Sequence, residues 1–438
     1  MIRALFAATL AAIALALPAK AAVEVQEITT PAGTEVWLVE ERGLPFVAIE
    51  LLFDGGTSLD APGALGAVNL MTALIEEGAG EMDARAFSIA REALAARFRF
   101  RAGRDSLVVS AEMLTENRDA AADLLRTALT EPRFDADAIE RVRGQVLSSI
   151  ASDMQDPRAL AGLRWNAEVF GDHPYGAPDD GTAESVAALT RDDLVAAHRG
   201  ALARDRVHVA AVGDIGADDL AALVDRLLSG LPETGAPLPG PAGFHAPGGV
   251  TVVPYDTPQS VIVFGQEGIA RDDPDFFPAF VMAEILGGSG FSARLMTEVR
   301  EKRGLTYGIY ADLAPFNHGA IISGQVATAN ETAAEVVALV REEWRRMADE
   351  GVTADELDAA QTFLTGAYPL RFDGNARIAG ILAGMMSEGL PTSYLETRND
   401  QVRAVTVDDI ARVARRLLRP EDLVFVVAGQ PEGLMAGN

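Results

Sequence analysis

The feature that most restricts the fold of this 438-residue chain is a similarity between two of its own segments. Residues 186–214, VAALTRDDLVAAHRGALARDRVHVAAVGD, align without a gap with residues 402–430, VRAVTVDDIARVARRLLRPEDLVFVVAGQ. Each copy predicts a helix capped by threonine, followed by an apolar strand that ends at glycine. A constant offset of 216 positions favours internal duplication over chance similarity between two α/β units. The corresponding positions are Thr190 with Thr406, Asp193 with Asp409, and Gly213 with Gly429.

Glycine and proline interrupt the chain near its middle. The stretch GLPETGAPLPGPAGFHAPGG, residues 230–249, has no periodic pattern and predicts a linker. It follows that residues 23–230 form an N-terminal domain, that 231–249 form the linker, and that 250–438 form a second, homologous domain. Two domains also suit the chain length.

The pattern within each half predicts the α+β class, with a mostly antiparallel sheet covered by helices. Apolar and polar residues alternate over residues 98–113, FRFRAGRDSLVVSAEM, as expected of two paired antiparallel strands. The same pattern recurs in the second half, where residues 305–314 precede a similar segment at 319–328.

The first 22 residues predict a cleavable secretory signal peptide. Arg3 precedes an apolar run over residues 4–17, and the sequence Ala19-Lys20-Ala21 follows, with small residues at the positions typical of a cleavage site, so we expect cleavage near Ala21 or Ala22. A membrane anchor is the alternative, but the run is too short to cross a bilayer comfortably. We therefore expect a periplasmic or secreted protein with no stable membrane anchor.

Composition excludes several classes of site and partner. The chain has no cysteine, so disulfides, thiolate metal sites and cysteine nucleophiles are absent from it. Its net charge of −27 opposes binding to nucleic acid. The negative field could favour cationic peptides, but solubility alone is the better explanation of the charge.

Residues 63–80, GALGAVNLMTALIEEGAG, predict one helix that ends at glycine. Asn69, Thr72 and Ala73 are spaced i, i+3 and i+4, so they share a face beside the apolar stripe. This face bears no charge.

Three long motifs occur in order along the chain and resemble those of one enzyme family. They are LFDGGTSLDAPG at 52–63, DHPYGAPDDGTAESVAALTRDDLVAAH at 172–198, and LGGSGFSARLMTEVREKRGLTYGIYA at 286–311. With the duplication, they make essentially the whole mature chain similar to the insulinase/pitrilysin zinc metallopeptidases, also called inverzincins. The resemblance implies a two-domain chain that forms half of a clamshell.

The catalytic motif of that family is H-x-x-E-H, in which two histidines bind zinc and the glutamate activates a water. The resemblance places the histidines at Asn69 and Ala73, the glutamate at Thr72, and a distal carboxylate ligand at Ser149. All four residue types are replaced here, and neutral amide and hydroxyl groups are poor zinc ligands. The resemblance thus implies a degenerate site, with no metal and no cofactor bound by this chain.

The remaining candidate residues indicate no other catalytic site. The five histidines have no pair spaced i+3 or i+4, and His173 belongs to a structural His-Pro-Tyr turn. Glu76 and Glu77 end the helix, where solvated charges are the usual interpretation. The stretch Gly287–Gly290 could bind an anion through its amides, but a structural turn is the better interpretation. No G-x-S-x-G nucleophile motif occurs.

One functional pair of the family is retained. Arg300 and Tyr307 match the arginine and tyrosine that the family uses to stabilise the oxyanion and to hold the peptide. A salt-bridged arginine and a packing tyrosine are the structural alternative, which we favour for the intervening Arg303.

A chain with this pair but without the zinc motif resembles the non-catalytic member of two-chain peptidases in the family. The resemblance implies a heterodimer with a related H-x-x-E-H chain, which holds the zinc, and a peptide substrate. A peptide-binding or scaffold protein without any catalytic role is the main alternative. An enzyme with an unrecognised site is a remote third possibility.

Overall fold

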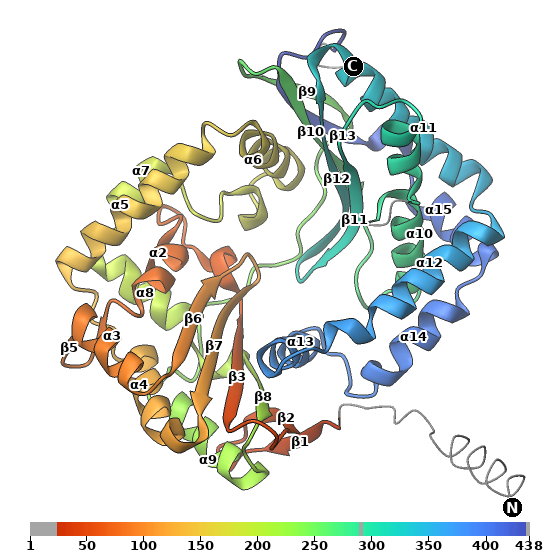
Figure 1. Cartoon of the computed structure of the whole chain (residues 1–438). Coiled ribbons are helices and arrows are strands. Elements are labelled where there is room, and N and C mark those ends of the chain that lie inside the picture. The colour runs from red at the N-terminus through yellow and green to blue at the C-terminus, as the bar shows by residue number, and fades with distance from the viewer. Residues whose placement is uncertain (1–23, 289–291, 435–438) are drawn as a thin grey trace, which may run out of the picture.

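The computed structural model describes residues 24–288 and 292–434. The predicted signal peptide and part of the Gly287–Gly290 stretch therefore lie outside the described residues. Two sheet-containing halves lie side by side, the N-terminal half in red to green and the C-terminal half in green to blue (Figure 1). In the described ranges, no helix is long and apolar enough to cross a membrane.

The N-terminal half contains a six-stranded sheet with the order β1-β2-β8-β3-β7-β6. The pair β2–β8 is parallel, and the other neighbours are antiparallel. The strands are β1 (Gln26–Thr29), β2 (Glu35–Glu40), β3 (Phe46–Asp54), β6 (Arg97–Ala102), β7 (Ser106–Leu114) and β8 (Val207–Gly213).

The C-terminal half contains a five-stranded sheet with the order β11-β12-β10-β13-β9. Here β13–β9 is parallel, and the other neighbours are antiparallel. The strands are β9 (Gly249–Pro254), β10 (Gln259–Glu267), β11 (Ile309–Phe316), β12 (Gly319–Ala329) and β13 (Val424–Gly429). The α+β class with mostly antiparallel sheets is thus confirmed.

The two sheets share one topology. The order β2-β8-β3-β7-β6 matches β9-β13-β10-β12-β11, and the parallel pair stands at the same place in both. The last strand of each half, β8 or β13, ends at a glycine with positive φ, which is 145° at Gly213 and 152° at Gly429. A Cβ there would collide with Phe46 O or Ser260 Oγ of the neighbouring strand. This correspondence is the arrangement that an internal duplication predicts.

Helices cover the outer faces of both sheets, and several carry predicted caps. Thr190 and Asp193 form a capping box at the start of α8 (Arg191–Ala201), as Thr406 and Asp409 do for α15 (Val407–Leu417). In the N-terminal half the other helices are α2 (Ala67–Leu74), α3 (Ala84–Ala93), α4 (Arg118–Thr130), α5 (Ala136–Asp153), α6 (Pro157–Phe170), α7 (Ala183–Ala188) and α9 (Ala217–Leu228). In the C-terminal half they are α10 (Phe276–Gly287), α11 (Ala333–Glu350), α12 (Ala354–Ala367), α13 (Asn375–Ser387) and α14 (Tyr394–Ala404).

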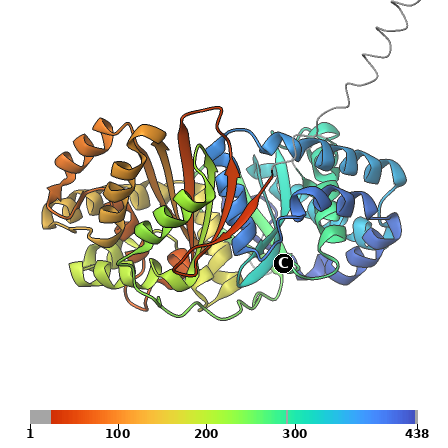
Figure 2. The ribbon, with the colours of Figure 1, turned by 90° about the horizontal axis from the view of Figure 1, so that it is seen from below.

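Each half lends one helix to the other. Helix α6 packs on β10 and β13 of the C-terminal sheet, and α13 packs on β3 and β8 of the N-terminal sheet. Trp165 of α6 is 2% exposed and donates from Nε1 to the Val424 carbonyl over 3.3 Å. Leu382 of α13 is fully buried against Trp37 and Val212. Figure 2, seen from below, shows α13 in blue against the N-terminal half.

Because the two halves exchange helices, the linker does not divide the chain into two separate cores. Residues 231–248 form no helix or strand and connect the N-terminal half to β9 of the C-terminal sheet. They do not separate the two cores, because the inner face of each sheet is completed by a helix from the other half. Residues of both halves therefore pack together in two shared hydrophobic clusters.

Candidate functional site

The helix predicted over residues 63–80 is shorter than expected. Helix α2 covers Ala67–Leu74, because Gly63 and Gly66 adopt φ values of 89° and 86° that do not belong to a right-handed helix. After the helix, Gly78–Ala79 pairs with Met82–Asp83 as a short hairpin. The three positions of the degenerate motif still lie on one helix.

Those three side chains point to different surroundings. Asn69 is half-buried and donates from Nδ2 to Asp180 Oδ1 over 2.7 Å. Thr72 is 4% exposed and donates from Oγ1 to the Val68 carbonyl over 2.7 Å. Ala73 is exposed and offers only a methyl group. The Thr72 hydroxyl thus donates its hydrogen bond to the helix backbone, and the Asn69 amide donates to a carboxylate.

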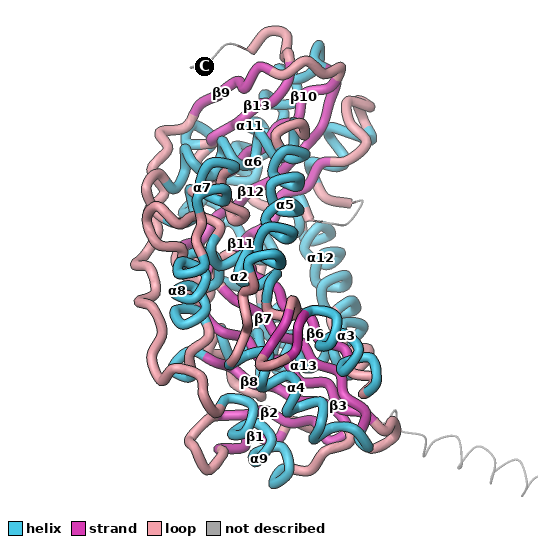
Figure 3. The backbone as a smooth tube through the Cα atoms, turned by 90° about the vertical axis from the view of Figure 1, so that its left-hand side faces the viewer, coloured by secondary structure: helices cyan, strands magenta, loops and turns pink. Residues whose placement is uncertain are grey.

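Ser149, the fourth position, is exposed on α5, which packs against α2. Figure 3 shows α5 and α7 on the side of the N-terminal half that carries α2 and α8. Over residues 24–288 and 292–434, no group of three or more His, Asp or Glu side chains could hold a metal ion. Zinc does not fit the residues that replace the motif, since none supplies an anionic or imidazole ligand.

Two carboxylates near α2, those of Asp60 and Asp180, accept hydrogen bonds from the helix. Asp60 accepts hydrogen bonds from the Gly66 and Val68 amides over 2.6 and 2.9 Å, which caps the start of α2. Burial raises the pKa of Asp60 to about 6. Burial also raises the pKa of Asp180, and the nearby carboxylate of Asp153 adds to the effect. The Asn69 amide therefore supplies a neutral donor to a carboxylate that is costly to charge.

Glu76 and Glu77 do not behave as the solvated charges that we expected. Glu76 pairs with Arg91, and Glu77 pairs with Arg141 over 2.5 Å. Both acids are half-buried, and their partners lie on α3 and α5. They are structural ion pairs rather than free acids.

Two histidines that are remote in sequence lie close together where the halves meet. The ring centroids of His173 and His318 are 6.4 Å apart. Tyr175 between them donates to Asp105 Oδ1 and accepts from the His318 amide over 3.0 Å. Burial lowers the pKa of His318, which keeps it neutral at pH 7. No third ligand completes a metal site in the described residues, and the cluster joins the two halves.

Arg300 and Tyr307 are brought together by the fold. Arg300 lies on a π-helix, Met296–Glu301, and its guanidinium lies 5.4 Å from the ring centroid of Tyr307. Tyr307 is 92% exposed, which is unusual for a large aromatic side chain. The packing role of the structural alternative is therefore excluded for this tyrosine.

Arg303 follows the structural interpretation instead. Its guanidinium lies 2.9 Å from Glu298, which also pairs with Lys302 over 2.6 Å and with Arg346 over 3.5 Å. The hydrogen bond from Lys302 and the neighbouring cations lower the pKa of Glu298 to about 2. This anion fixes the π-helix that carries Arg300.

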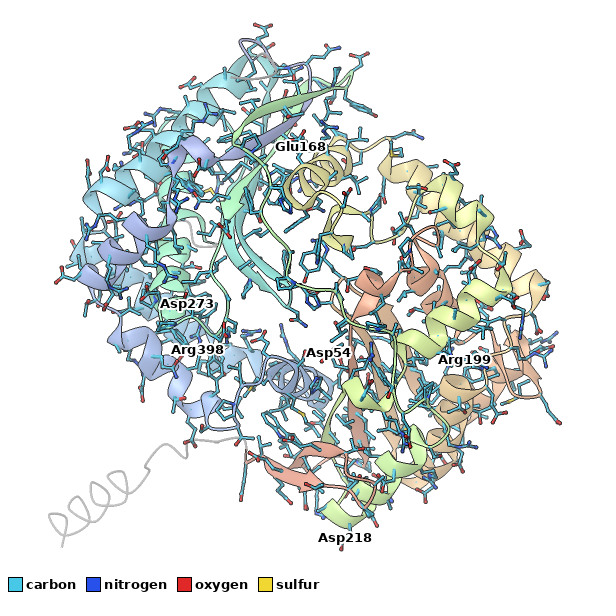
Figure 4. The ribbon with its side chains drawn as sticks, turned by 180° about the vertical axis from the view of Figure 1, so that it is seen from behind. Asp54, Glu168, Arg199, Asp218, Asp273 and Arg398 are labelled. Atoms are coloured by element: carbon cyan, nitrogen blue, oxygen red, sulfur yellow. The ribbon has the colours of Figure 1, made fainter. Side chains whose placement is uncertain are left out.

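A cavity between the two halves was not predicted from the sequence. It has a volume of about 980 Å³ and lies between β6 and β7 of the N-terminal half and helices α10, α13 and α14 of the C-terminal half. Seven arginines line it, and its described lining includes neither Arg300 nor Tyr307. Figure 4 labels Arg398, one of these arginines, on the C-terminal half, and Arg199 on the far side of the N-terminal half.

Two family models match this chain in succession. The model described as insulinase, peptidase family M16, matches residues 36–178. The model described as peptidase M16 inactive domain matches residues 188–364. Together these ranges include the degenerate motif in the first half and the Arg300–Tyr307 pair in the second.

Relatives and solved structures agree with these matches. The chain is 28% identical to a non-peptidase homolog, YmxG, of Helicobacter pylori, over 89% of this chain and 90% of that one. It is 32% identical to an uncharacterized zinc protease of Mycobacterium bovis, over 70% and 71%. A crystal structure of a peptidase M16 inactive domain from Pseudomonas fluorescens superposes with a TM-score of 0.87 at 33% identity, over 95% and 99%. This chain therefore belongs to the insulinase family, peptidase family M16.

Proposed function

We propose that this chain is the non-catalytic subunit of an exported zinc-dependent peptidase. In this proposal a separate H-x-x-E-H chain holds the zinc and the water. The present chain supplies Arg300, Tyr307 and one wall of the chamber in which the peptide is bound. The loss of all four motif positions and the names of the similar proteins support a non-catalytic role.

The observation that carries the proposal is the pairing of Arg300 with an exposed Tyr307. Burying an aromatic ring is normally favourable by about 2 kcal/mol, so an exposed position calls for another use of the side chain. A guanidinium and a phenol are both hydrogen-bond donors. Across an interface they could stabilise the negative oxygen that forms when the partner's water attacks a peptide carbonyl.

The cellular compartment is part of the proposal. It rests on the charged start, the short apolar run and the small residues of positions 1–22, which are typical of a secretory signal. Cleavage there would release the mature chain into the periplasm or the medium. N-terminal sequencing of the exported protein tests this point.

The test of the catalytic role uses the complex with the H-x-x-E-H chain. Tyr307→Phe and Arg300→Ala, made in the present chain alone, should each lower peptide turnover by roughly a hundredfold, about 3 kcal/mol. Complex formation, measured by gel filtration, should be unchanged. Arg345→Ala is the matched control, since it removes an exposed arginine of α11 that pairs with Glu342 and not with the π-helix of Arg300. Turnover within about twofold of the wild type for both variants would leave the pair without a catalytic role.

A peptide-binding or scaffold protein is the second candidate. The replacement of every residue of the zinc motif favours it, because nothing of the metal site has been retained. Under this function, peptide binding would survive both substitutions, and no hydrolysis would accompany any complex.

A further inference from the structure

We infer that the arginine-lined cavity between the two halves binds an extended peptide with acidic side chains at alternating positions. The inference rests on the proposed function in one respect: it names the class of peptide that would enter the chamber of the proposed peptidase. The cavity itself is built entirely from this chain, and peptide binding to it requires no partner.

One wall of the cavity is a ladder of arginines on strand β6. Arg97, Arg99 and Arg101 alternate with Phe98 and Phe100. The phenylalanines face the core of the N-terminal half, and the arginines are exposed on the cavity side. The ladder lies beside α13 rather than under it, because α13 packs mainly on β3 and β8 and β6 is the edge strand of the sheet.

The spacing of the ladder matches an extended peptide. Side chains two residues apart on a strand repeat every ~6.7 Å, and an extended ligand has the same repeat. Carboxylates at every second position of such a ligand could therefore each meet one guanidinium. Arginine suits this pairing, because its planar fork can bind a carboxylate through two hydrogen bonds.

The opposite wall adds several aromatic rings and the other four arginines, Arg271, Arg371, Arg377 and Arg398. Arg371 and Arg377 lie before and within the first turn of α13. Phe276 and Tyr394 belong to the wall formed by α10 and α14. Apolar groups next to the charges could hold the intervening side chains of a peptide.

The charge of the cavity is opposite to that of the molecule. The chain carries 64 acidic and 37 basic residues, but the cavity lining has seven arginines and three glutamates, with no lysine or aspartate. Glu112 pairs with Arg97 over 3.9 Å, and Glu388 pairs with Arg271 over 3.3 Å. Glu50 is close enough to Arg101 for the arginine to lower its pKa, although burial raises it more.

The remaining arginines of the cavity lining have no acidic partner of this kind among the described residues. Within the described ranges, no ion pair involves Arg99, Arg371 or Arg377. In a chain with so many acids, unpaired arginines that face one cavity indicate that an external anion neutralises them. A nucleic acid is disfavoured, since the outer surface of a chain with a net charge of −27 repels a long polyanion.

The experiment measures binding to the isolated mature chain by fluorescence anisotropy. The probes are a labelled capped peptide that alternates glutamate with alanine, the same peptide with lysine in place of glutamate, and an oligothymidylate of equal charge. We expect the glutamate peptide to bind, with an affinity that falls as salt is raised. The lysine peptide and the oligothymidylate should bind at least about tenfold more weakly.

Variants locate the site. Arg99→Glu should weaken binding of the glutamate peptide by about tenfold or more and strengthen binding of the lysine peptide. Arg199→Glu makes the same change in charge on an exposed position of α8, outside the cavity, and should alter binding less than about twofold. Circular dichroism of both variants verifies the fold.

Several outcomes would overturn the inference. They are equal binding of the two peptides to the wild type, equal binding of the oligothymidylate, no binding of the glutamate peptide, and equal losses in the two variants. None of these depends on hydrolysis. If turnover in the complex responds to Tyr307→Phe while the acidic peptide fails to bind, the proposed function stands and this inference falls. If the peptide binds and turnover does not respond, the reverse holds.

Discussion

Asn69 donates a hydrogen bond to Asp180 over 2.7 Å, at the helix position to which the family resemblance assigns the first histidine of the zinc motif. The contact joins α2 to the loop before α7, and it satisfies a half-buried carboxylate whose pKa is raised by burial. The Asn69 side chain therefore has a structural role. A histidine restored at this position would remove the amide donor from Asp180.

The first prediction concerns metal content. The mature chain, dialysed and analysed by atomic emission, should hold less than about 0.1 zinc per chain, because no motif position supplies an imidazole or carboxylate. The matched control is a catalytic relative with an intact H-x-x-E-H motif, treated in the same way. About one tightly held zinc per chain would contradict the assignment of a degenerate site.

The second prediction concerns the exchanged helices. Trp165→Ala should lower the free energy of unfolding by about 3–5 kcal/mol, because it leaves a cavity between α6 and the C-terminal sheet. Urea unfolding monitored by circular dichroism measures the change. Arg164→Ala, on the exposed face of the same helix, should change it by no more than about 0.5 kcal/mol. Equal effects would show that α6 does not contribute its apolar face to the other half.

The third prediction follows from the same exchange and uses the two halves as separate chains. Residues 23–240 alone should expose the apolar face of α6 and the sheet surface around Trp37, so this fragment should bind a hydrophobic dye and self-associate. Coexpression with residues 241–438 should restore a soluble one-to-one complex on gel filtration. A monomeric, dye-free N-terminal fragment would mean that its core is complete without α13.

The fourth prediction is a pH dependence. The pKa of Glu298 is lowered to about 2 in the folded chain, below its usual value, so its charge stabilises the fold above about pH 4.5. This stabilisation is lost as the pH falls from about 4.5 toward 2. Glu298→Gln should therefore destabilise the protein by about 2 kcal/mol at neutral pH, and by much less near pH 2.5.

The control for this experiment is Glu301→Gln, which removes an exposed carboxylate from the same π-helix. Its effect on the free energy of unfolding should stay within about 0.5 kcal/mol at every pH. If the destabilisation by Glu298→Gln did not shrink in acid, the ion pairs with Lys302 and Arg303 would not be the source of the stability.

The sequence determined the local elements and their repetition. The sequence alone predicts the threonine caps at Thr190 and Thr406, because a helix cap depends on contacts within a few residues. It also predicts the strand-ending glycines Gly213 and Gly429, because positive φ is a steric limit of the backbone. The placement of Asn69, Thr72 and Ala73 on one helix could also be predicted, since their spacing is a property of one helix. The predicted bounds of this helix were wrong: Gly63 and Gly66 have positive φ before its start, and the helix ends at Leu74, ahead of the short hairpin that begins at Gly78.

The tertiary structure decided the relations between distant segments. The apolar face of α6 predicts burial but does not say against which sheet, and only the packing of the two halves places Trp165 on β13. Arg97, Arg99 and Arg101 have the alternating pattern of any strand with one solvated face. They line a cavity because α13 covers the neighbouring strands and α10 and α14 close the opposite side. Such contacts depend on how the halves meet in space, which a pattern local to one segment does not encode.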